Sequence, residues 1–210
     1  MRVRRTPGLS LSVAIAIAIT LAAAPVAVAN DHESQEEYCT AQSGQIVELK
    51  PTISPGSDSE VELAGSLNVC QFISQDGDSP TQILVDLNTL HSERPTLAGL
   101  AYLAKVPSSD AGAAGSNPAS SYCPVDLGGT EAFGTAASGA WVGALDPGME
   151  AGDTDPLGNT VNLCVFADRS AIDSWGLLYN SQGTVRGIDL ATVMRYQPGD
   201  DSPQVFSGEG

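Results

Sequence analysis

The two histidines are the first residues to consider for catalysis, since histidine is the commonest general base in enzymes. His32 lies near the start of the chain, and His91 lies in a polar stretch just before Pro95. A surface turn is the simpler interpretation of that stretch, because polar residues concentrate in loops. The sequence contains no Gly-x-Ser-x-Gly, His-Glu-x-x-His or phosphate-binding glycine motif. It therefore predicts no catalytic residue, and a secreted hydrolase with His91 as base stands as an alternative.

Four carboxylates lie close together in a glycine-rich segment and offer the oxygen ligands that Ca²⁺ prefers. They are Asp146, Glu150, Asp153 and Asp155. Their spacing lacks the ligand register of an EF-hand loop, so a solvated loop is the simpler interpretation. We expect no cofactor, with Ca²⁺ at these residues as the alternative.

Three aromatic residues are candidate ligand contacts, because aromatic rings offer a large apolar area to a partner. Trp175 and Tyr179 would share one face of a helix, since four residues separate them. Together with Trp141 they would line a groove for a glycan or for a peptide of an unknown protein. Packing in the core is the other interpretation, because buried aromatic rings dominate core energetics.

The start of the chain has the order of a secretory signal peptide. Arginines at positions 2, 4 and 5 precede an apolar run that ends at Ala27-Val28-Ala29. We expect cleavage after Ala29 and a secreted or periplasmic mature chain without stable insertion in a membrane. Three of the 9 Lys and Arg lie in this segment, which leaves six cations against 25 acids and a net charge of −19. Such a charge repels nucleic acid and favours cationic partners.

An internal repeat organises the mature chain. Each copy contains a Tyr-Cys pair, at Cys39 and Cys123, and an Asn-x-Cys-x-Phe segment, at Cys70 and Cys164. After the second cysteine the copies align without a gap, so that residues 83–85 match residues 177–179. An even cysteine count in an exported chain predicts disulfides. The repeat predicts Cys39–Cys70 and Cys123–Cys164, while pairing between the copies stays open.

Both copies predict the same order of elements: a short helix, two strands, an undetermined element and a last helix. In copy two the first helix covers residues 119–125, with Asn117 as N-cap and Pro118 as first residue. The predicted strands are 45–49, 67–73, 130–133, 141–142 and 160–166, and the last helices are 95–104 and 189–196. Residues 81–90 and 170–179 fit either a strand or a helix.

The second copy resembles the bacterial secreted domains of unknown function of family 333, which are often labelled haemolysins. The match covers roughly residues 115–180 and is carried by Asn117-Pro118-Ala119-Ser120, Tyr122-Cys123, Gly128-Gly129, residues 164–170 and Trp175. The resemblance implies an exported small α+β domain. Ile172 stands where the family has a third cysteine, and Arg169 replaces its usual glycine. The family's second disulfide is therefore absent, and no basic amphipathic helix supports a membrane-active role.

We therefore expect an α+β protein with two tandem repeats, each with an antiparallel sheet and its own disulfide. The expected parts are a signal peptide (1–29), repeat one (30–106), a linker (107–116), repeat two (117–198) and a disordered tail (199–210). The predicted function is a non-enzymatic binding or envelope-associated module. A secreted protease inhibitor, with the loop 134–159 as its inserting element, is a second alternative beside the hydrolase.

Overall fold

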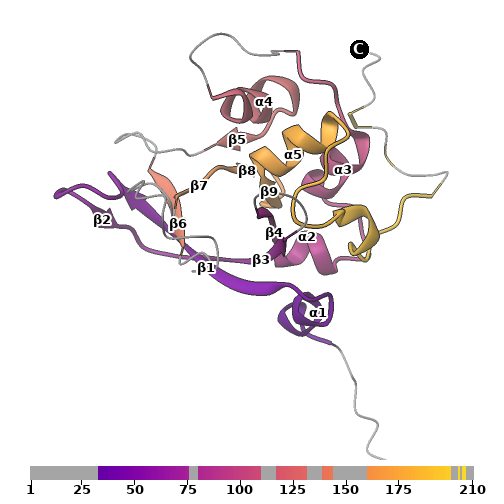
Figure 1. Ribbon diagram of the computed structural model, residues 1–210, viewed down its shortest axis with the longest axis horizontal. Coiled ribbons are helices and arrows are strands. Elements are labelled where there is room, and N and C mark those ends of the chain that lie inside the picture. The colour runs from indigo at the N-terminus through magenta and orange to yellow at the C-terminus, as the bar shows by residue number, and fades with distance from the viewer. Residues whose placement is uncertain are drawn as a thin grey trace, which may run out of the picture. The chain divides into compact units, whose positions relative to one another are not determined.

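The chain folds as an α+β structure in which helices cover one face of a curled antiparallel sheet (Figure 1). The computed structural model describes residues 33–75, 80–109, 117–131, 139–143, 160–199, 203 and 205–206. All of them belong to one unit, Glu33–Gly210. The predicted signal peptide and most of the predicted linker lie outside the described residues.

The described helices and strands follow one another in the order given by their numbers. The helices are α1 (Gln35–Ala41), α2 (Leu87–His91), α3 (Leu97–Ala104), α4 (Pro118–Asp126), α5 (Ser174–Ser181) and the 3-10 helix η1 (Leu190–Thr192). The strands are β1 (Gln45–Ile53), β2 (Val61–Glu62), β3 (Leu67–Ser74), β4 (Thr81–Asp86), β5 (Thr130–Glu131), β6 (Ala140–Gly143), β7 (Thr160–Val161), β8 (Leu163–Val165) and β9 (Ala171–Asp173).

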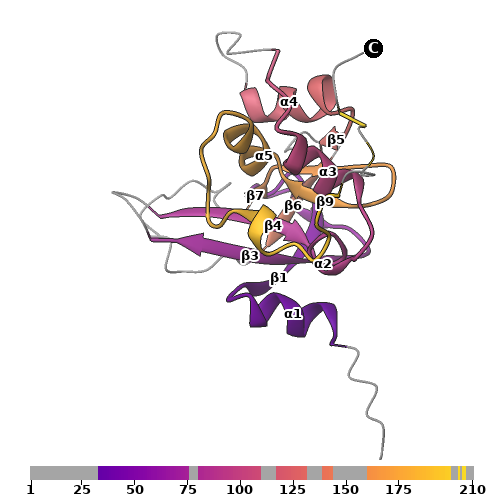
Figure 2. The ribbon, with the colours of Figure 1, turned by 90° about the vertical axis from the view of Figure 1, so that its right-hand side faces the viewer.

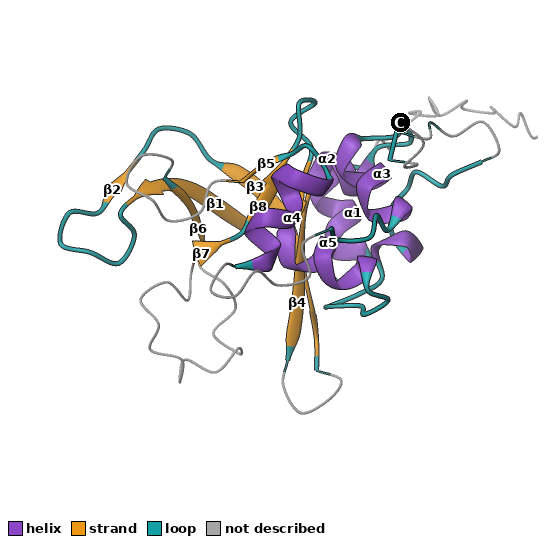
Figure 3. Ribbon diagram, turned by 90° about the horizontal axis from the view of Figure 1, so that it is seen from above, coloured by secondary structure: helices purple, strands orange, loops and turns teal. Residues whose placement is uncertain are grey.

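The strands form a single sheet with the order β5-β8-β9-β4-β3-β1-β6-β7, and β2 pairs with the far end of β1. Every pairing is antiparallel. β7 and β8 lie near opposite ends of this order, yet only Asn162 separates them in the sequence. The sheet must therefore curl back towards itself, with the helices gathered on one side (Figure 3).

Alternation along the strands divides the buried residues between two cores. Cys70 and Val85 face the helices and join a cluster that includes Tyr102, Tyr122 and Leu178. Their neighbours in the chain, Val69 and Leu84, face the inside of the curl and pack with Val47, Leu49, Val161, Leu163 and Ala171. The sheet is thus buried on both faces, which fixes its register.

Polar caps set where the helices begin. Ser34 and Glu37 form a capping box at α1, and Asn117 accepts hydrogen bonds from the first turn of α4, as the sequence predicts. Pro118 is the first residue of α4. The predicted helix 95–104 begins at Leu97, because Thr96 is its cap.

The two undetermined segments are each a strand followed by a helix. β4 leads directly into α2, and β9 leads directly into α5. At each junction an aspartate, Asp86 or Asp173, accepts hydrogen bonds from backbone N–H groups of the next turn. A side-chain cap at the last strand residue stops the strand and starts the helix.

Both predicted disulfides are present, Cys39–Cys70 and Cys123–Cys164, and each ties a helix to a strand. A glycine lies against each of them. A Cβ atom on Gly44 would be 2.2 Å from Cys70 Sγ, and one on Gly129 would be 2.5 Å from Cys164 Sγ. α1 and α4, which carry Cys39 and Cys123, lie far apart, at the bottom and the top of the view in Figure 2.

Four predictions differ from the structure. The predicted strand 160–166 is two strands, β7 and β8, which Asn162 separates and which lie near opposite ends of the strand order. The ungapped alignment is wrong, because residues 83–85 lie in a strand and residues 177–179 in a helix. Cys70 pairs with Val85, and Cys164 pairs with Ile172. More residues therefore separate the paired positions in the hairpin of β3 and β4 than in the hairpin of β8 and β9. The helix predicted at 189–196 is only the turn η1. Strands from both predicted repeats share one sheet instead of forming two.

Candidate functional site

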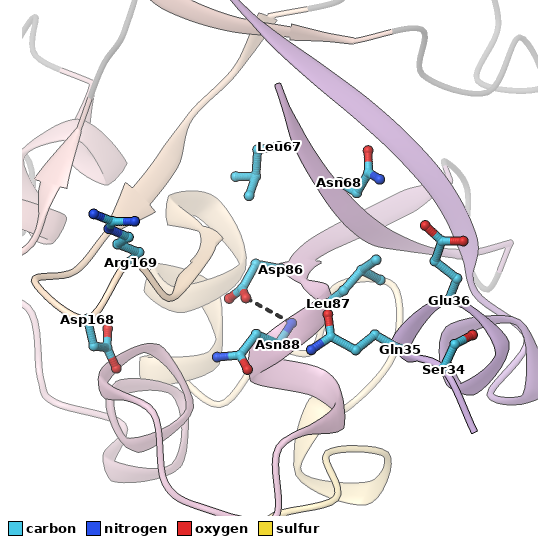
Figure 4. A pocket seen from close by; sticks show the side chains of 10 residues that line it. All are labelled: Ser34, Gln35, Glu36, Leu67, Asn68, Asp86, Leu87, Asn88, Asp168 and Arg169. Carbon is cyan, nitrogen blue, oxygen red and sulfur yellow. Dashed lines mark hydrogen bonds between the residues drawn. The ribbon is translucent and has the colours of Figure 1, made fainter. Parts of the chain in front are cut away.

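A polar groove of about 730 Å³ lies where four separate segments of the chain meet (Figure 4). They are the first turn of α1, the start of β3, the junction of β4 with α2, and the turn between β8 and β9. The groove is lined by Ser34, Gln35, Glu36, Leu67, Asn68, Asp86, Leu87, Asn88, Asp168 and Arg169. Its volume falls within the range of pockets that hold small ligands or short peptides.

Asp86 joins two walls of the groove. Its carboxylate accepts hydrogen bonds from the backbone N–H groups of Asn88 and Thr89, both at 3.0 Å, and from the Thr89 hydroxyl. It also accepts one from the backbone N–H of Ala171 in β9, at 2.7 Å. Burial raises the pKa of Asp86 above its ordinary value, although these hydrogen bonds oppose the shift. Asp86 therefore holds β4, α2 and β9 together beneath the groove.

Asp168 fixes the turn between β8 and β9. Its carboxylate accepts hydrogen bonds from the backbone N–H groups of Leu97, at 2.8 Å, and Ser170, at 3.1 Å, and from the Ser170 hydroxyl. Burial alone would raise the pKa of Asp168, but these hydrogen bonds outweigh it and lower the pKa below its ordinary value. The Ser170 hydroxyl in turn accepts from Ala98 N–H at 2.9 Å. The turn is thus anchored on the start of α3.

Five other polar side chains of the groove have no such partners. Within the described part of the chain, their side chains make no hydrogen bond or ion pair, and all five residues are exposed. They are Gln35, Glu36, Asn68, Asn88 and Arg169. A rim of available donors and acceptors above a fixed floor is the arrangement that a binding site requires.

A second group of polar residues is buried near the Cys123–Cys164 disulfide. Glu131 pairs with Cys164 across the sheet, and its carboxylate accepts a hydrogen bond from the Ser120 hydroxyl at 2.6 Å. Burial raises the pKa of Glu131 and raises the pKa of Asp173 to about 6. The guanidinium of Arg186 opposes the shift at Asp173, and the charge of Glu131 adds to it. The pairing is incomplete, because Glu131 Oε2 and Arg186 Nε are buried and have no hydrogen-bond partner among the described residues.

His91 belongs to a cluster of side chains that connects Arg195, after η1, with the start of α1. Its Nε2 lies 3.0 Å from a guanidinium nitrogen of Arg195, which also pairs with Glu33 and lies 4.4 Å from the ring centre of Tyr38. The same Nε2 lies 3.1 Å from the Glu33 carbonyl oxygen, so it accepts from the guanidinium in one tautomer and donates to the carbonyl in the other. Among the described residues, no Ser, Thr or Cys hydroxyl or thiol is hydrogen-bonded to His91. This arrangement gives His91 a structural role.

The three aromatic candidates do not form one groove. Trp175 and Tyr179 share a face of α5 as predicted, with ring centres 5.8 Å apart, and Arg186 lies over the Tyr179 ring. Trp141 is in β6 and packs against the core inside the curl, whereas Trp175 packs against the core under the helices. All three are half-buried.

The four carboxylates of the alternative Ca²⁺ site, Asp146, Glu150, Asp153 and Asp155, lie outside the described residues. Within the described ranges, no three His, Cys, Asp or Glu side chains gather closely enough to hold a metal ion. None of the described helices combines the length and the apolarity needed to cross a lipid bilayer.

No pattern in the sequence singles out the groove. Asp168, Arg169 and Ser170 belong to the residues that carry the family resemblance. Among the other lining residues, Asn68 alone belongs to a motif, the repeated Asn-x-Cys-x-Phe segment. The available clue is the polar turn after β8, in which Arg169 replaces the glycine of the family pattern. That turn gives no indication of the other three segments, which fold against it from far away in the sequence.

No protein-family model matches this chain, and no similar protein was found among curated proteins or solved structures.

Proposed function

We propose that this chain is an exported, non-enzymatic binding module that holds a segment of a partner protein in the groove. The observation that carries this proposal is the set of five exposed polar side chains without partners, which come from four segments and converge on one groove. The floor is held by Asp86 and the turn by Asp168, so ligand binding would require little ordering of the protein. The strongly acidic composition suits a partner segment that carries positive charge.

We further propose that the chain contains two diverged copies of one unit, as its cysteines suggest. Each disulfide joins the first helix of a unit to a strand, with a glycine packed against it. In each unit a strand ends at a capping aspartate, Asp86 or Asp173. An experimental structure tests this: the helix, disulfide and three strands of one unit should superpose on those of the other.

The repeat supports the choice of the groove as the binding site. Glu36 corresponds to Ser120, because each lies three residues before the first cysteine of its unit. Asn68 corresponds to Asn162, two residues before the second cysteine, and Asp86 corresponds to Asp173, the cap at the end of a strand. In the second unit these positions are closed by the Glu131 carboxylate, which accepts from Ser120. In the first unit the apolar Ile46 stands in place of Glu131, and Glu36 and Asn68 remain exposed at the groove.

Export and the family resemblance remain part of this proposal. The signal pattern, the two disulfides and the acidic surface support a secreted or periplasmic protein. The resemblance to family 333 is supported by the residues that carry it, Asn117-Pro118 at the start of α4 and Gly129 beside the disulfide. A haemolytic activity has no support in the groove, most of whose lining residues are polar.

The proposal is tested by mapping peptide binding on the protein with NMR. A pool of random tetrapeptides is added to ¹⁵N-labelled protein with intact disulfides, and we expect backbone amide shifts at the four groove segments. Asn88→Trp, an exposed substitution that fills the groove, should abolish these shifts. Glu93→Trp, an equally exposed substitution elsewhere, should preserve them. An absence of shifts at millimolar peptide, or shifts confined to other surfaces, would refute the binding role of the groove.

A further inference from the structure

The groove has opposite charges at its two sides. Figure 4 shows Arg169 on one side and Glu36 on the other, with Asp86 and Asn88 between them. Neither Arg169 nor Glu36 makes an ion pair within the described residues. The neighbouring carboxylate of Asp168 keeps its negative charge, but its oxygens accept from Leu97 and Ser170 and it makes no ion pair with Arg169 among the described residues.

Arg169 is held in place by its backbone. Its φ angle is +66°, in the left-handed region that L-residues other than Asn and Asp rarely adopt. Its N–H donates to the Phe166 carbonyl at 2.9 Å, and both neighbours, Asp168 and Ser170, are tied to the start of α3. An unfavourable backbone conformation at a non-glycine residue persists where the surroundings enforce it, and such residues concentrate at ligand sites. The anchored turn therefore presents the guanidinium at the groove.

Between the charged sides, the groove offers amide groups. Gln35, Asn68 and Asn88 each have a carbonyl oxygen and an NH₂ group, which match the N–H and C=O groups of a peptide backbone. A guanidinium binds carboxylates through paired hydrogen bonds, and a carboxylate binds ammonium or guanidinium groups. The lining is thus complementary to a short peptide with a negative and a positive end.

We infer that the groove binds the C-terminal segment of a partner protein, with its terminal carboxylate on Arg169 and a basic side chain a few residues earlier on Glu36. This inference rests on the proposed function and adds the chemistry and the direction of the bound chain. The net charge of −16 disfavours polyanions at this surface, so a single carboxylate needs a compensating cation in the same ligand. The peptide amides lie along Asn68, Asn88 and Gln35.

Three defined tetrapeptides test the inference by calorimetry and by NMR. The first is acetyl-Lys-Ala-Ala-Ala with a free carboxylate, the second is its C-terminal amide, and the third is acetyl-Gln-Ala-Ala-Ala with a free carboxylate. We expect the first to bind in the groove and the other two to bind about tenfold more weakly, since each loses one charge-assisted contact.

Two matched variants assign each end. Arg169→Gln should weaken the free acid about tenfold and leave the affinity for the amide unchanged, and Glu36→Gln should do the same for the lysine and glutamine peptides. Arg94→Gln and Glu93→Gln remove the same charges from an exposed site elsewhere and should change nothing. Equal binding of all three peptides in the groove would overturn the inference and leave the proposed function standing. Binding of none, with the random pool also inactive, would overturn both.

Discussion

Replacing Asp173 with Asn should stabilise the protein at neutral pH and remove part of its pH dependence. Asp173 is 5 % exposed, and burial raises its pKa from 3.8 to about 6, with Glu131 adding to the shift and Arg186 opposing it. Asn keeps an oxygen to accept the hydrogen bond from Trp175 N–H, which is 3.0 Å long, and Asn caps helices as well as Asp. The substitution therefore removes the ionisation while keeping the cap of α5.

The magnitude follows from the difference between the two pKa values. A group whose pKa is higher in the folded state favours folding when it is protonated, so this stabilisation is present in full below pH 3.8 and is lost as the pH rises through 6. A difference of about two pKa units corresponds to about 3 kcal/mol. We expect the variant to exceed the wild type by up to about 3 kcal/mol at pH 7 and to match it near pH 3.5; the attraction to Arg186 is already contained in the pKa of about 6.

Urea denaturation with the disulfides intact, followed by tryptophan fluorescence at several values between pH 3.5 and 8, measures this difference directly. The comparison between variant and wild type removes the contribution of Asp86, which titrates in both proteins, and reports Asp173 together with its coupling to Glu131. A constant difference across this range would show that Asp173 ionises normally in the folded state. A variant that is less stable than the wild type at pH 7 would contradict the reasoning outright.

Three other substitutions test the framework around the groove. Asp168→Asn should have the opposite pH dependence, because the pKa of Asp168 is lowered in the folded state. The variant should be less stable than the wild type at neutral pH, and the difference should disappear as the pH falls through the folded-state pKa. A difference that persists at pH 2 would argue against this reasoning. Removing Cys39–Cys70 by double substitution to Ser should lower the free energy of unfolding by about 4 kcal/mol for a separation of 31 residues. A loss below about 1 kcal/mol in urea denaturation would speak against that disulfide as a main constraint. Gly129→Ala should lower the free energy of unfolding by about 1–3 kcal/mol, because its Cβ would overlap Cys164 Sγ. The control Gly199→Ala, whose Cβ meets no atom within 4 Å, should leave the melting temperature unchanged. Equal melting temperatures of the two variants would disprove the close packing at Gly129.

Local residue chemistry predicted much of the fold. The cysteine spacing and the two Tyr-Cys pairs gave the disulfides, and Asn117 with Pro118 gave the start of α4. The short strand at Trp141 was also visible as a β-branched and aromatic pair. These features depend on neighbours in the sequence or on covalent pairing, which a single sequence records.

The errors arose where distant contacts decide the structure. Strand and helix meet inside one apolar stretch at Asp86 and again at Asp173, so a window over the whole stretch averages two periodicities. The ungapped alignment failed because the two hairpins differ in length while their cysteine registers agree. Hairpin length leaves no mark on the hydrophobic pattern of the strands themselves.

The candidate site was even less visible, because its walls come from segments that lie far apart in the chain. The sequence pointed to aromatic residues, and the i, i+4 spacing correctly paired Trp175 with Tyr179. Trp141 packs in the other core, and the groove itself has no aromatic lining. Exposed Asn, Gln and Glu residues are common on any surface, and only the tertiary fold brings these particular ones together.

The position of a bound peptide is the most direct test of the groove as the binding site. The peptide acetyl-Lys-Ala-Ala-Ala, with a nitroxide spin label on its N-terminal side, broadens the NMR signals of nearby backbone amides. Our account predicts that broadening is strongest around Glu36 and Asn68, and that it spares Trp141 and Tyr179. Broadening centred on Trp175 and Tyr179, or spread evenly over the protein, would contradict it.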